Sequence, residues 1–222
     1  MSIKIILTED GSVTLFNDDL NEVYHSKYGA INESRHVFIQ SGLKLFKEEE
    51  HVSVLEIGMG TGLNILLTFM HSNSQNVNYT TIEPFPPNAS VINQLNYPEL
   101  LDSIKATPVF KNIHQSAWNQ WVSLDQNFAF QKIDKTLQLV EFDECSFHLV
   151  YFDAFSPDVQ PELWSEEQFI KIFKWLKPGG VLVTYSSRGA VKRALQAAGF
   201  SVEKIPGPKG KREIIRAFKL KT

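Results

Sequence analysis

The sequence predicts an α/β fold of the doubly wound, Rossmann-like kind, in which helices cover both faces of a mainly parallel sheet. The first observation is an apolar, β-branched run over residues 52–57 that passes through closely spaced glycines into an apolar helical run over residues 63–70. The second is the alternation of strand-like and helix-like segments along most of the chain. The third is the ending, where two strand-like segments are joined only by a basic loop. We therefore expect a parallel sheet that closes with an antiparallel strand.

The composition bounds the number of domains and the compartment. A chain of 222 residues can bury one α/β core. We expect an extension made of a β-hairpin and a helix over residues 1–50, packed on a main domain over residues 51–222. Cys145 is the single cysteine, which excludes an internal disulfide, and the sequence shows no signal peptide or long apolar run. These features predict a cytoplasmic protein without a membrane segment.

The extension is expected to form a hairpin followed by a helix. Strand-like runs over residues 3–7 and 12–16 flank an Asp-Gly pair, which is a strong hairpin signal between apolar runs. Asn32 is the expected N-cap of a helix over residues 33–46, whose apolar residues share one face. This helix should cover the first strand of the main sheet.

The main domain should alternate strands with helices. After the first strand and helix, we predict strands over residues 77–82, 109–113, 137–142, 147–152 and 181–185, helices over residues 89–95, 162–176 and 190–198, and a turn over residues 177–180. Strands over residues 200–205 and 213–218 complete the sheet. Because no helix joins these last two strands, they should pair as an antiparallel hairpin.

The glycine loop that follows the first main strand predicts a cofactor site. Gly58, Gly60 and Gly62 allow a tight turn and a close approach of backbone to a ligand. A dinucleotide loop usually has the pattern G-x-G-x-x-G and binds a pyrophosphate, whereas here Glu56 precedes evenly spaced glycines and a carboxylate would repel phosphate. The pattern favours S-adenosylmethionine, which has a cationic amino group and no phosphate. We expect these residues and Asn64 to bind it; the alternative is an ordinary strand-to-helix turn.

Acidic residues follow several predicted strands, at the edge of the sheet where α/β folds bind ligands. Glu83 ends the second main strand, where a carboxylate can accept hydrogen bonds from both ribose hydroxyls. Asp134 follows a less certain strand and is the expected partner of the adenine amino group. Each could instead be an ordinary loop carboxylate.

Asp153 directly follows a buried strand and is the predicted catalytic residue. An amine that attacks a sulfonium methyl group must be neutral, in line with the breaking bond and freed from water. A fixed carboxylate can accept its N–H and orient the lone pair. Positioning of this kind can remove roughly 7 to 11 kcal/mol of a barrier. Phe155 is expected to form a wall of this site, although Asp153 could also be an N-cap and Phe155 a core residue.

The charge of the chain is uneven and predicts an anionic partner. From Arg188 onward there are ten lysine and arginine residues against two acidic ones, a net charge of +8, while the rest of the chain carries −11. Nucleic acid is the obvious candidate. Ser187 and Arg188 follow a strand, and Lys209, Lys211 and Arg212 lie in the last loop, so we expect all five to contact substrate. The alternative is a solvated basic tail.

Motifs spread over nearly the whole chain resemble one family. They occupy residues 23–26 (Val-Tyr-His-Ser), 33–38 (Glu-Ser-Arg-His-Val-Phe), 56–64 (the glycine loop), 82–86 (Ile-Glu-Pro-Phe-Pro), 152–157 (Phe-Asp-Ala-Phe-Ser-Pro), 161–164 (Pro-Glu-Leu-Trp), 178–180 (Pro-Gly-Gly), 185–187 (Tyr-Ser-Ser), 198–200 (Ala-Gly-Phe) and 210–213 (Gly-Lys-Arg-Glu). The chain resembles the tRNA 5-methylaminomethyl-2-thiouridine methyltransferases, the MnmC family. It is similar to a stand-alone form of the domain that bifunctional members fuse to a flavin-dependent oxidase.

The resemblance implies a class I methyltransferase fold and a reaction. A methyl group would pass from S-adenosylmethionine to the exocyclic amine of 5-aminomethyl(-2-thio)uridine at the tRNA wobble position. By the same resemblance Asp153 holds the amine, Glu83 binds ribose and the glycine loop binds the methionine end. A separate flavin-dependent enzyme would supply the aminomethyl group. Residues 119–144 do not match the family clearly, which leaves the adenine-binding acid open.

Two other functions are compatible with parts of the sequence. One is methyl or aminopropyl transfer to a small-molecule amine on the same fold, which would not need the basic C-terminal part. The other is a non-catalytic RNA-binding module, which would not need Glu56, the glycines and Asp153 together. No histidine and cysteine cluster has metal-ligand spacing, so we predict no catalytic metal.

Overall fold

A computed structural model describes residues 2–221 and contains two sheets. The strands are β1 (Ile3–Leu7), β2 (Val13–Asn17), β3 (Glu22–Val23), β4 (His51–Ile57), β5 (Asn76–Ile82), β6 (Trp121–Asp125), β7 (Phe128–Ile133), β8 (Phe147–Phe152), β9 (Leu176–Thr184), β10 (Ser201–Pro206) and β11 (Glu213–Phe218). The α-helices are α1 (Ala30–Ser34), α2 (Leu63–His71), α3 (Ala89–Ile92), α4 (Tyr97–Leu100), α5 (Ala106–Gln115), α6 (Glu166–Trp175) and α7 (Gly189–Ala197). A π-helical turn (Arg35–Gln40) and three 3-10 turns (Leu43–Phe46, Leu137–Leu139 and Pro161–Trp164) complete the described elements.

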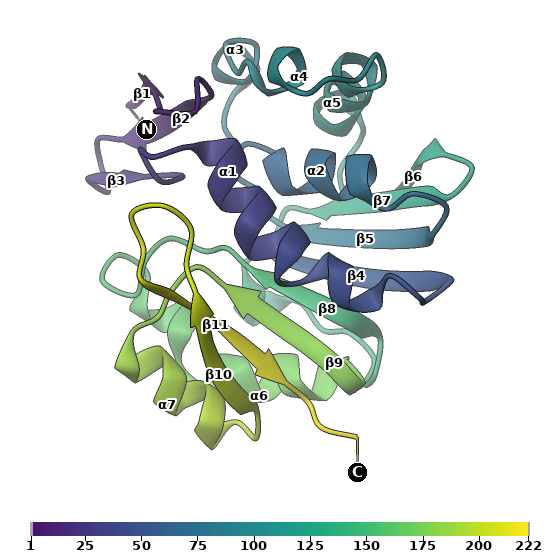
Figure 1. The fold of residues 1–222 in the computed structure, drawn as a ribbon, viewed down its shortest axis with the longest axis vertical. Coiled ribbons are helices and arrows are strands. Elements are labelled where there is room, and N and C mark those ends of the chain that lie inside the picture. Colours follow the sequence, from purple (N-terminus) through teal and green to yellow (C-terminus); the bar gives the residue numbers. More distant parts are fainter. Residues whose placement is uncertain (1, 222) are drawn as a thin grey trace.

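The large sheet has the strand order β10-β11-β9-β8-β4-β5-β7-β6 (Figure 1). β4 pairs in parallel with β5 on one side and with β8 on the other, and the pairs β5–β7 and β8–β9 are also parallel. β11 is antiparallel to both β9 and β10. The predicted doubly wound sheet and its antiparallel closing hairpin are therefore confirmed.

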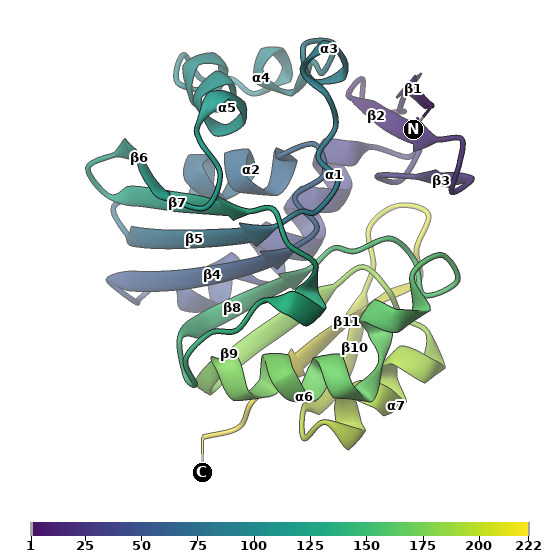
Figure 2. The ribbon, with the colours of Figure 1, turned by 180° about the vertical axis from the view of Figure 1, so that it is seen from behind.

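Two apolar cores lie on opposite faces of this sheet, and the strands divide their side chains between them. Val54 of β4 belongs to the core under α2 and α5, whereas Leu55 belongs to the core under α6 and α7. Leu149 and Val150 of β8 alternate in the same way, as expected from the period of two in a strand. Figure 2 shows the two helical layers from behind. The carboxyl ends of the parallel strands are left uncovered by these layers, and the site is built there.

The extension folds as predicted in its first part and differs at its helix. β1 and β2 pair as an antiparallel hairpin, to which β3 adds. The helix begins at Ala30, so the prediction that Asn32 is its N-cap was wrong. The carboxylate of Asp10 accepts the Asn32 backbone N–H at 2.9 Å, and the Ser12 hydroxyl accepts that of Ala30 at 3.1 Å. The hairpin turn thus supplies the cap, because these donors of a first helical turn need a partner from somewhere.

The segment between the second and fourth main strands differs most from the predictions. The strand predicted over residues 109–113 is part of helix α5. Its buried residues Ala106, Val109, Phe110 and Ile113 follow the spacing of a helix face, which the β-branched residues had obscured. The strand predicted over residues 137–142 is a 3-10 turn. The strands of this region are β6 and β7, which pair as an antiparallel hairpin at the sheet edge.

Three smaller differences concern element ends. The turn predicted over residues 177–180 lies inside β9, where an irregular register between Phe147 and Leu149 of β8 accommodates the extra residues. The helix predicted from residue 162 is a 3-10 turn followed by α6, because the Ser165 hydroxyl accepts the Gln168 N–H and starts a new helix. The helix predicted over residues 89–95 ends early as α3. Among residues 2–221 no helix has both the length and the apolar character to cross a membrane.

Candidate active site

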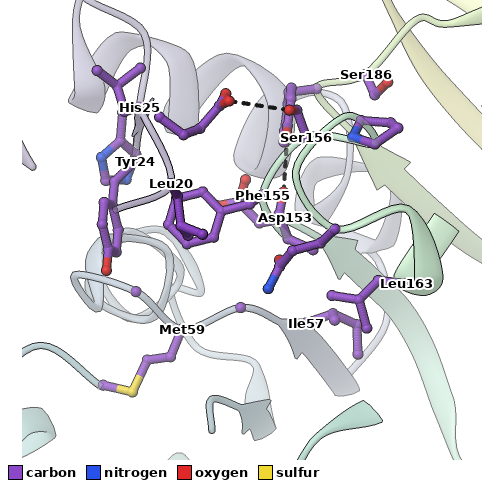
Figure 3. A pocket seen from close by; sticks show the side chains of 18 of the residues that line it. Leu20, Tyr24, His25, Ile57, Met59, Asp153, Phe155, Ser156, Leu163 and Ser186 are labelled. Atoms are coloured by element: carbon purple, nitrogen blue, oxygen red, sulfur yellow. Dashed lines mark hydrogen bonds between the residues drawn. The ribbon is translucent and has the colours of Figure 1, made fainter. Parts of the chain in front are cut away.

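A cavity of about 550 Å³ opens at the carboxyl ends of β4, β5, β8 and β9. Two segments far apart in the sequence close its other side, namely residues 20–26 of the extension and residues 211–213 at the start of β11. Figure 3 shows Tyr24 and His25 from the first of these segments, facing Asp153 and Phe155 across the cavity. This is the edge at which α/β sheets bind ligands.

The glycine loop joins β4 to α2 and forms the floor of the cavity. Gly58 has a φ of +90°, and a Cβ on it would lie 2.6 Å from the backbone oxygen of Asp153. Gly62, with a φ of +74°, lies against the His114 ring in the same way. Only glycine accepts this combination of left-handed backbone and close neighbours. Gly58 and Gly60 line the cavity, whereas Gly62 does not and instead allows the turn into α2.

Glu83 lies at the end of β5, in the wall of the cavity. Its carboxylate accepts the backbone N–H of Gly60 at 3.0 Å and that of Phe85 at 2.8 Å. Burial raises the pKa of this group, while the two backbone donors lower it. The structure therefore fixes a carboxylate directly beside the glycine loop, where the sequence placed the ribose contact.

Asp153 lies at the end of β8 on the other side of the loop. The side-chain amide of Asn64 donates to its Oδ2 at 2.8 Å, and within residues 2–221 its Oδ1 has no hydrogen-bond partner. Burial, and then the charge of Glu56, raise the pKa of Asp153 well above its usual value. One oxygen is thus fixed and the other faces the cavity. Asn64, expected to contact the cofactor, instead lies outside the cavity wall and orients Asp153.

Glu56 does not line the cavity, so the direct cofactor contact expected from the sequence is absent. Its side chain is fully buried behind the glycine loop, where a carboxyl oxygen accepts the Thr81 hydroxyl at 2.8 Å. Burial raises the pKa of Glu56 to about 8. The group is therefore mostly neutral at pH 7, and the repulsion of phosphate that the sequence suggested is weak. Its observed contacts connect β4, β5 and the start of α2.

Asp134 also lies outside the cavity wall. Its carboxylate is exposed and accepts the Asn119 side-chain amide at 2.7 Å. The residues of this region that line the cavity are 136–138, which the 3-10 turn after Asp134 carries inward. The adenine contact expected of Asp134 stays a prediction that this geometry does not favour.

The acceptor side of the cavity is aromatic and acidic. The Phe155 ring meets the Tyr24 ring edge to face, with centroids 4.9 Å apart. Glu22 accepts a hydrogen bond from the Ser156 hydroxyl at 3.2 Å, and Glu33 of α1 also lines the cavity (Figure 3). The sequence assigned no role to Tyr24 or Glu33. The signal for both was that they belong to motifs shared with the resembling family, at residues 23–26 and 33–38.

Most of the cations expected to contact substrate are in ion pairs. Both terminal nitrogens of Arg188 contact the Asp158 carboxylate, one of them at 2.6 Å. Lys209 pairs with Glu9 at 2.6 Å and does not line the cavity. Lys211 lines it and pairs with Glu33 at 2.8 Å.

Arg212 differs from these three cations. It is exposed at the cavity rim and has no ion-pair partner in the part of the chain that the structure describes. Ser187 lines the cavity beside Arg188. In residues 2–221 no group of histidine, cysteine, aspartate and glutamate side chains could hold a metal ion.

Comparison with known proteins identifies the family. A family model described as "S-adenosyl-L-methionine-dependent methyltransferase" matches residues 105–220, which is more than half of the chain. The chain belongs to the S-adenosyl-L-methionine-dependent methyltransferases. This membership confirms the predicted class of fold, and it confirms the cofactor that the glycine loop indicated.

Curated relatives of this methyltransferase are about three times as long. The "tRNA 5-methylaminomethyl-2-thiouridine biosynthesis bifunctional protein MnmC" of Aromatoleum aromaticum is 30% identical over 96% of this chain and 35% of its own length. The protein of the same name from Burkholderia mallei is 30% identical over 95% of this chain and 34% of its own length. The chain therefore spans about a third of these relatives.

Solved structures agree on the fold of this methyltransferase. MNMC2 from Aquifex aeolicus has a TM-score of 0.78 at 25% identity, over 100% of this chain and 72% of the other. Spermidine synthase from Thermotoga maritima has a TM-score of 0.60 at 15% identity, over 99% of this chain and 69% of the other. The second similarity shows the fold alone.

The residues around the cavity of this methyltransferase fit its cofactor. The bare backbone at Gly58 and Gly60 permits a ligand to approach closely. Two carboxylates, Glu83 and Asp153, line the cavity on either side of this backbone, where they complement the hydroxyls and positive charges of S-adenosylmethionine.

Proposed function

We propose that this methyltransferase methylates the exocyclic amine of 5-aminomethyl(-2-thio)uridine at the tRNA wobble position and forms 5-methylaminomethyl(-2-thio)uridine. The names of the relatives support this reaction. The observation that carries it is the placement of Asp153, which has one fixed oxygen and one free oxygen beside the glycine loop. That arrangement suits an amine as methyl acceptor.

On the cofactor side, the chain offers a backbone loop and a carboxylate. S-adenosylmethionine supplies an electrophilic methyl group when it is bound. Gly58 and Gly60 would contact its methionine end through their backbone, and Glu83 would accept hydrogen bonds from its ribose hydroxyls. Because Glu83 is already bonded to the Gly60 N–H, binding at the ribose and binding at the loop are connected.

On the acceptor side, Asp153 would hold the amine and take up a proton. Its free Oδ1 can accept an N–H and turn the nitrogen lone pair toward the methyl group. The nitrogen must lose one proton to end as a neutral secondary amine, and a carboxylate whose pKa is raised by burial is a better proton acceptor than an ordinary aspartate. The Phe155 and Tyr24 rings would exclude water from the transfer.

The rim of the cavity would contact RNA. Arg212 can bind a phosphate without first breaking an ion pair, and the Ser187 hydroxyl can donate to one. The finer assignments of Arg188 and Lys209 to RNA require their ion pairs with Asp158 and Glu9 to open. A flavin-dependent enzyme would supply the aminomethyl group by removing the carboxymethyl part of its precursor.

A reconstituted reaction tests the proposal. The substrate is an anticodon stem-loop that carries 5-aminomethyl-2-thiouridine at the wobble position, mixed with S-adenosylmethionine and the protein. Nucleoside mass spectrometry should show conversion to 5-methylaminomethyl-2-thiouridine. The matched stem-loop with unmodified uridine should gain no methyl group. Absence of transfer to the aminomethyl substrate, with the cofactor bound, would refute the proposal.

A further inference from the structure

Lys211 is a cation in the wall of the cavity, although it belongs to the basic loop between β10 and β11. Its ammonium lies 2.8 Å from Glu33 Oε1 and 4.0 Å from the centre of the Tyr185 ring. The Lys211 side chain is 29% exposed and that of Glu33 is 8% exposed. A lysine placed in this way is poorly available to a phosphate on the molecular surface. Its position calls for a function inside the cavity.

Glu33 and Asp153 are two carboxyl groups in the same cavity. Oε2 of Glu33 accepts the Ser26 backbone N–H at 2.6 Å, so this group is fixed by the extension. Asp153 is fixed from the opposite side by Asn64. Two carboxylates that share a cavity shielded from water disfavour each other's ionisation. Glu33 accordingly raises the pKa of Asp153 and Lys211 lowers it, although burial is the largest cause of its shift.

The other groups that face this cluster change little near neutral pH. Burial lowers the pKa of His25 to about 4, so its ring is neutral, and burial raises the pKa of Tyr185 well above its usual value. Glu22 accepts a hydrogen bond from a serine hydroxyl, and Arg188 is already in an ion pair. Lys211 is therefore the charge that compensates Glu33.

We infer that Lys211 is a positioning residue for the methyl acceptor: it neutralises Glu33, so that Asp153 is the carboxylate left ionised to receive an N–H of the amine. The identity of that amine rests on the proposed function, but the effect of Lys211 on Asp153 does not. The neighbouring Arg212 lies at the rim without an ion-pair partner in residues 2–221. Adjacent cations of one loop thus have different tasks, one toward the acceptor amine and one toward RNA.

Titration of Asp153 in the protein without ligands tests the inference directly. Carbon-13 NMR of labelled aspartate carboxyl groups follows the ionisation, and Asp153→Asn identifies the resonance. In Lys211→Met the midpoint of Asp153 should rise by roughly one pH unit or more, because a neighbouring cation is lost and Glu33 is left uncompensated. The double variant Glu33→Gln with Lys211→Met should return the midpoint toward that of the wild type. Lys211→Arg should stay near it.

Lys209→Gln is the matched control, since it removes a paired cation from the same loop outside the cavity. It should leave the Asp153 midpoint unchanged. An Asp153 midpoint that is the same in Lys211→Met and in the wild type would overturn the inference. A shift of equal size in Lys209→Gln would also overturn it, because the effect would then be one of general charge.

The activity of the same variants separates this inference from the proposed function. With the aminomethyl stem-loop, Lys211→Met should react about tenfold more slowly at pH 7, the change in ionised fraction that one pH unit carries. The rate should recover at higher pH, and the salt dependence of RNA binding should stay unchanged. A flattened salt dependence without a pH effect would make Lys211 a phosphate contact instead. If the wild type transfers no methyl group, the proposed function fails while the titration still decides the effect of Lys211.

Discussion

The two halves of the cavity are assembled in different ways. The cofactor half consists of the glycine loop and Glu83, which lie at the ends of two neighbouring strands and are joined by one hydrogen bond. The acceptor half combines Asp153 after β8 with Tyr24 and Glu33 of the extension and Lys211 of the last loop. A site that serves one cofactor can be built from local sequence. The acceptor half needs segments from across the chain, and these are the parts that can vary without disturbing cofactor binding.

Replacing Asp153 should separate the two halves most strongly. Asp153→Ala removes the group that holds the amine, so turnover of the aminomethyl stem-loop should fall by about 10² or more. Calorimetry should still detect binding of S-adenosylmethionine, because Glu83 and the loop are untouched. Unchanged turnover would reject the assigned role. Asp153→Asn is the conservative control, since it can keep its contact with Asn64 while it loses the charge.

Replacing Glu83 should act on the other half. Glu83→Gln weakens the hydrogen bonds that a charged group makes to the loop and to the ribose, each worth about 1.5 to 3 kcal/mol. Affinity for S-adenosylmethionine should therefore fall roughly tenfold to a hundredfold. Affinity for the stem-loop should stay the same. An equal loss of RNA and cofactor binding would show that the halves are not separate.

Glu56 predicts a pH dependence of stability that belongs to the cofactor half. Its pKa is raised from 4.5 to about 8 in the folded protein, so the folded state binds more protons than the unfolded state between these values. The free energy of unfolding should therefore fall as pH rises through this window, by at most about 1.4 kcal/mol per pH unit for this group.

Chemical denaturation of the wild type and of Glu56→Gln at pH 5 and pH 8 measures that contribution. The variant should lose less stability than the wild type between the two pH values, because glutamine does not ionise. Parallel pH dependence in both proteins would contradict the assignment. The comparison cancels the other buried groups, which titrate in both.

Replacing Arg212 should have the smallest effect and confine it to RNA. Arg212→Gln should weaken stem-loop binding a few-fold and reduce the slope of log affinity against log salt by about one, as expected for one lost phosphate contact. Lys209→Gln is the control, because its ammonium already has a carboxylate partner. Identical slopes in the wild type and Arg212→Gln would remove Arg212 from the RNA interface.

The same division explains what the sequence could predict. The glycine loop, Glu83 and Asp153 were found because each follows an apolar strand directly, and the topology of a parallel sheet brings such positions together. The conformation of residues 106–115 was misjudged because β-branched residues fit a buried helix face as well as a strand. Asn32 looked like a cap because the true cap, Asp10, lies in another element.

Charge pairing was beyond a reading of the sequence. Lys209, Lys211 and Arg212 are nearly adjacent and chemically alike, yet only the folded chain shows that the first two contact Glu9 and Glu33. Partners so distant in the sequence leave no local pattern. Glu56 was misjudged for a related reason, because burial and not residue type decides whether a carboxyl group is charged.

The contacts of the last loop with the extension also set an order of events during synthesis. Lys209 reaches Glu9, a separation of 200 residues, and the backbone oxygen of Pro206 contacts the His36 ring at 2.8 Å. Contacts at such separation form late, because a long stretch of chain must be ordered before they can close. The glycine loop and Glu83 can take shape while the ribosome still holds the second half of the chain. The acceptor half is completed only when residues 206–213 have emerged, so a nascent chain would bind the methyl donor before it can accept a substrate.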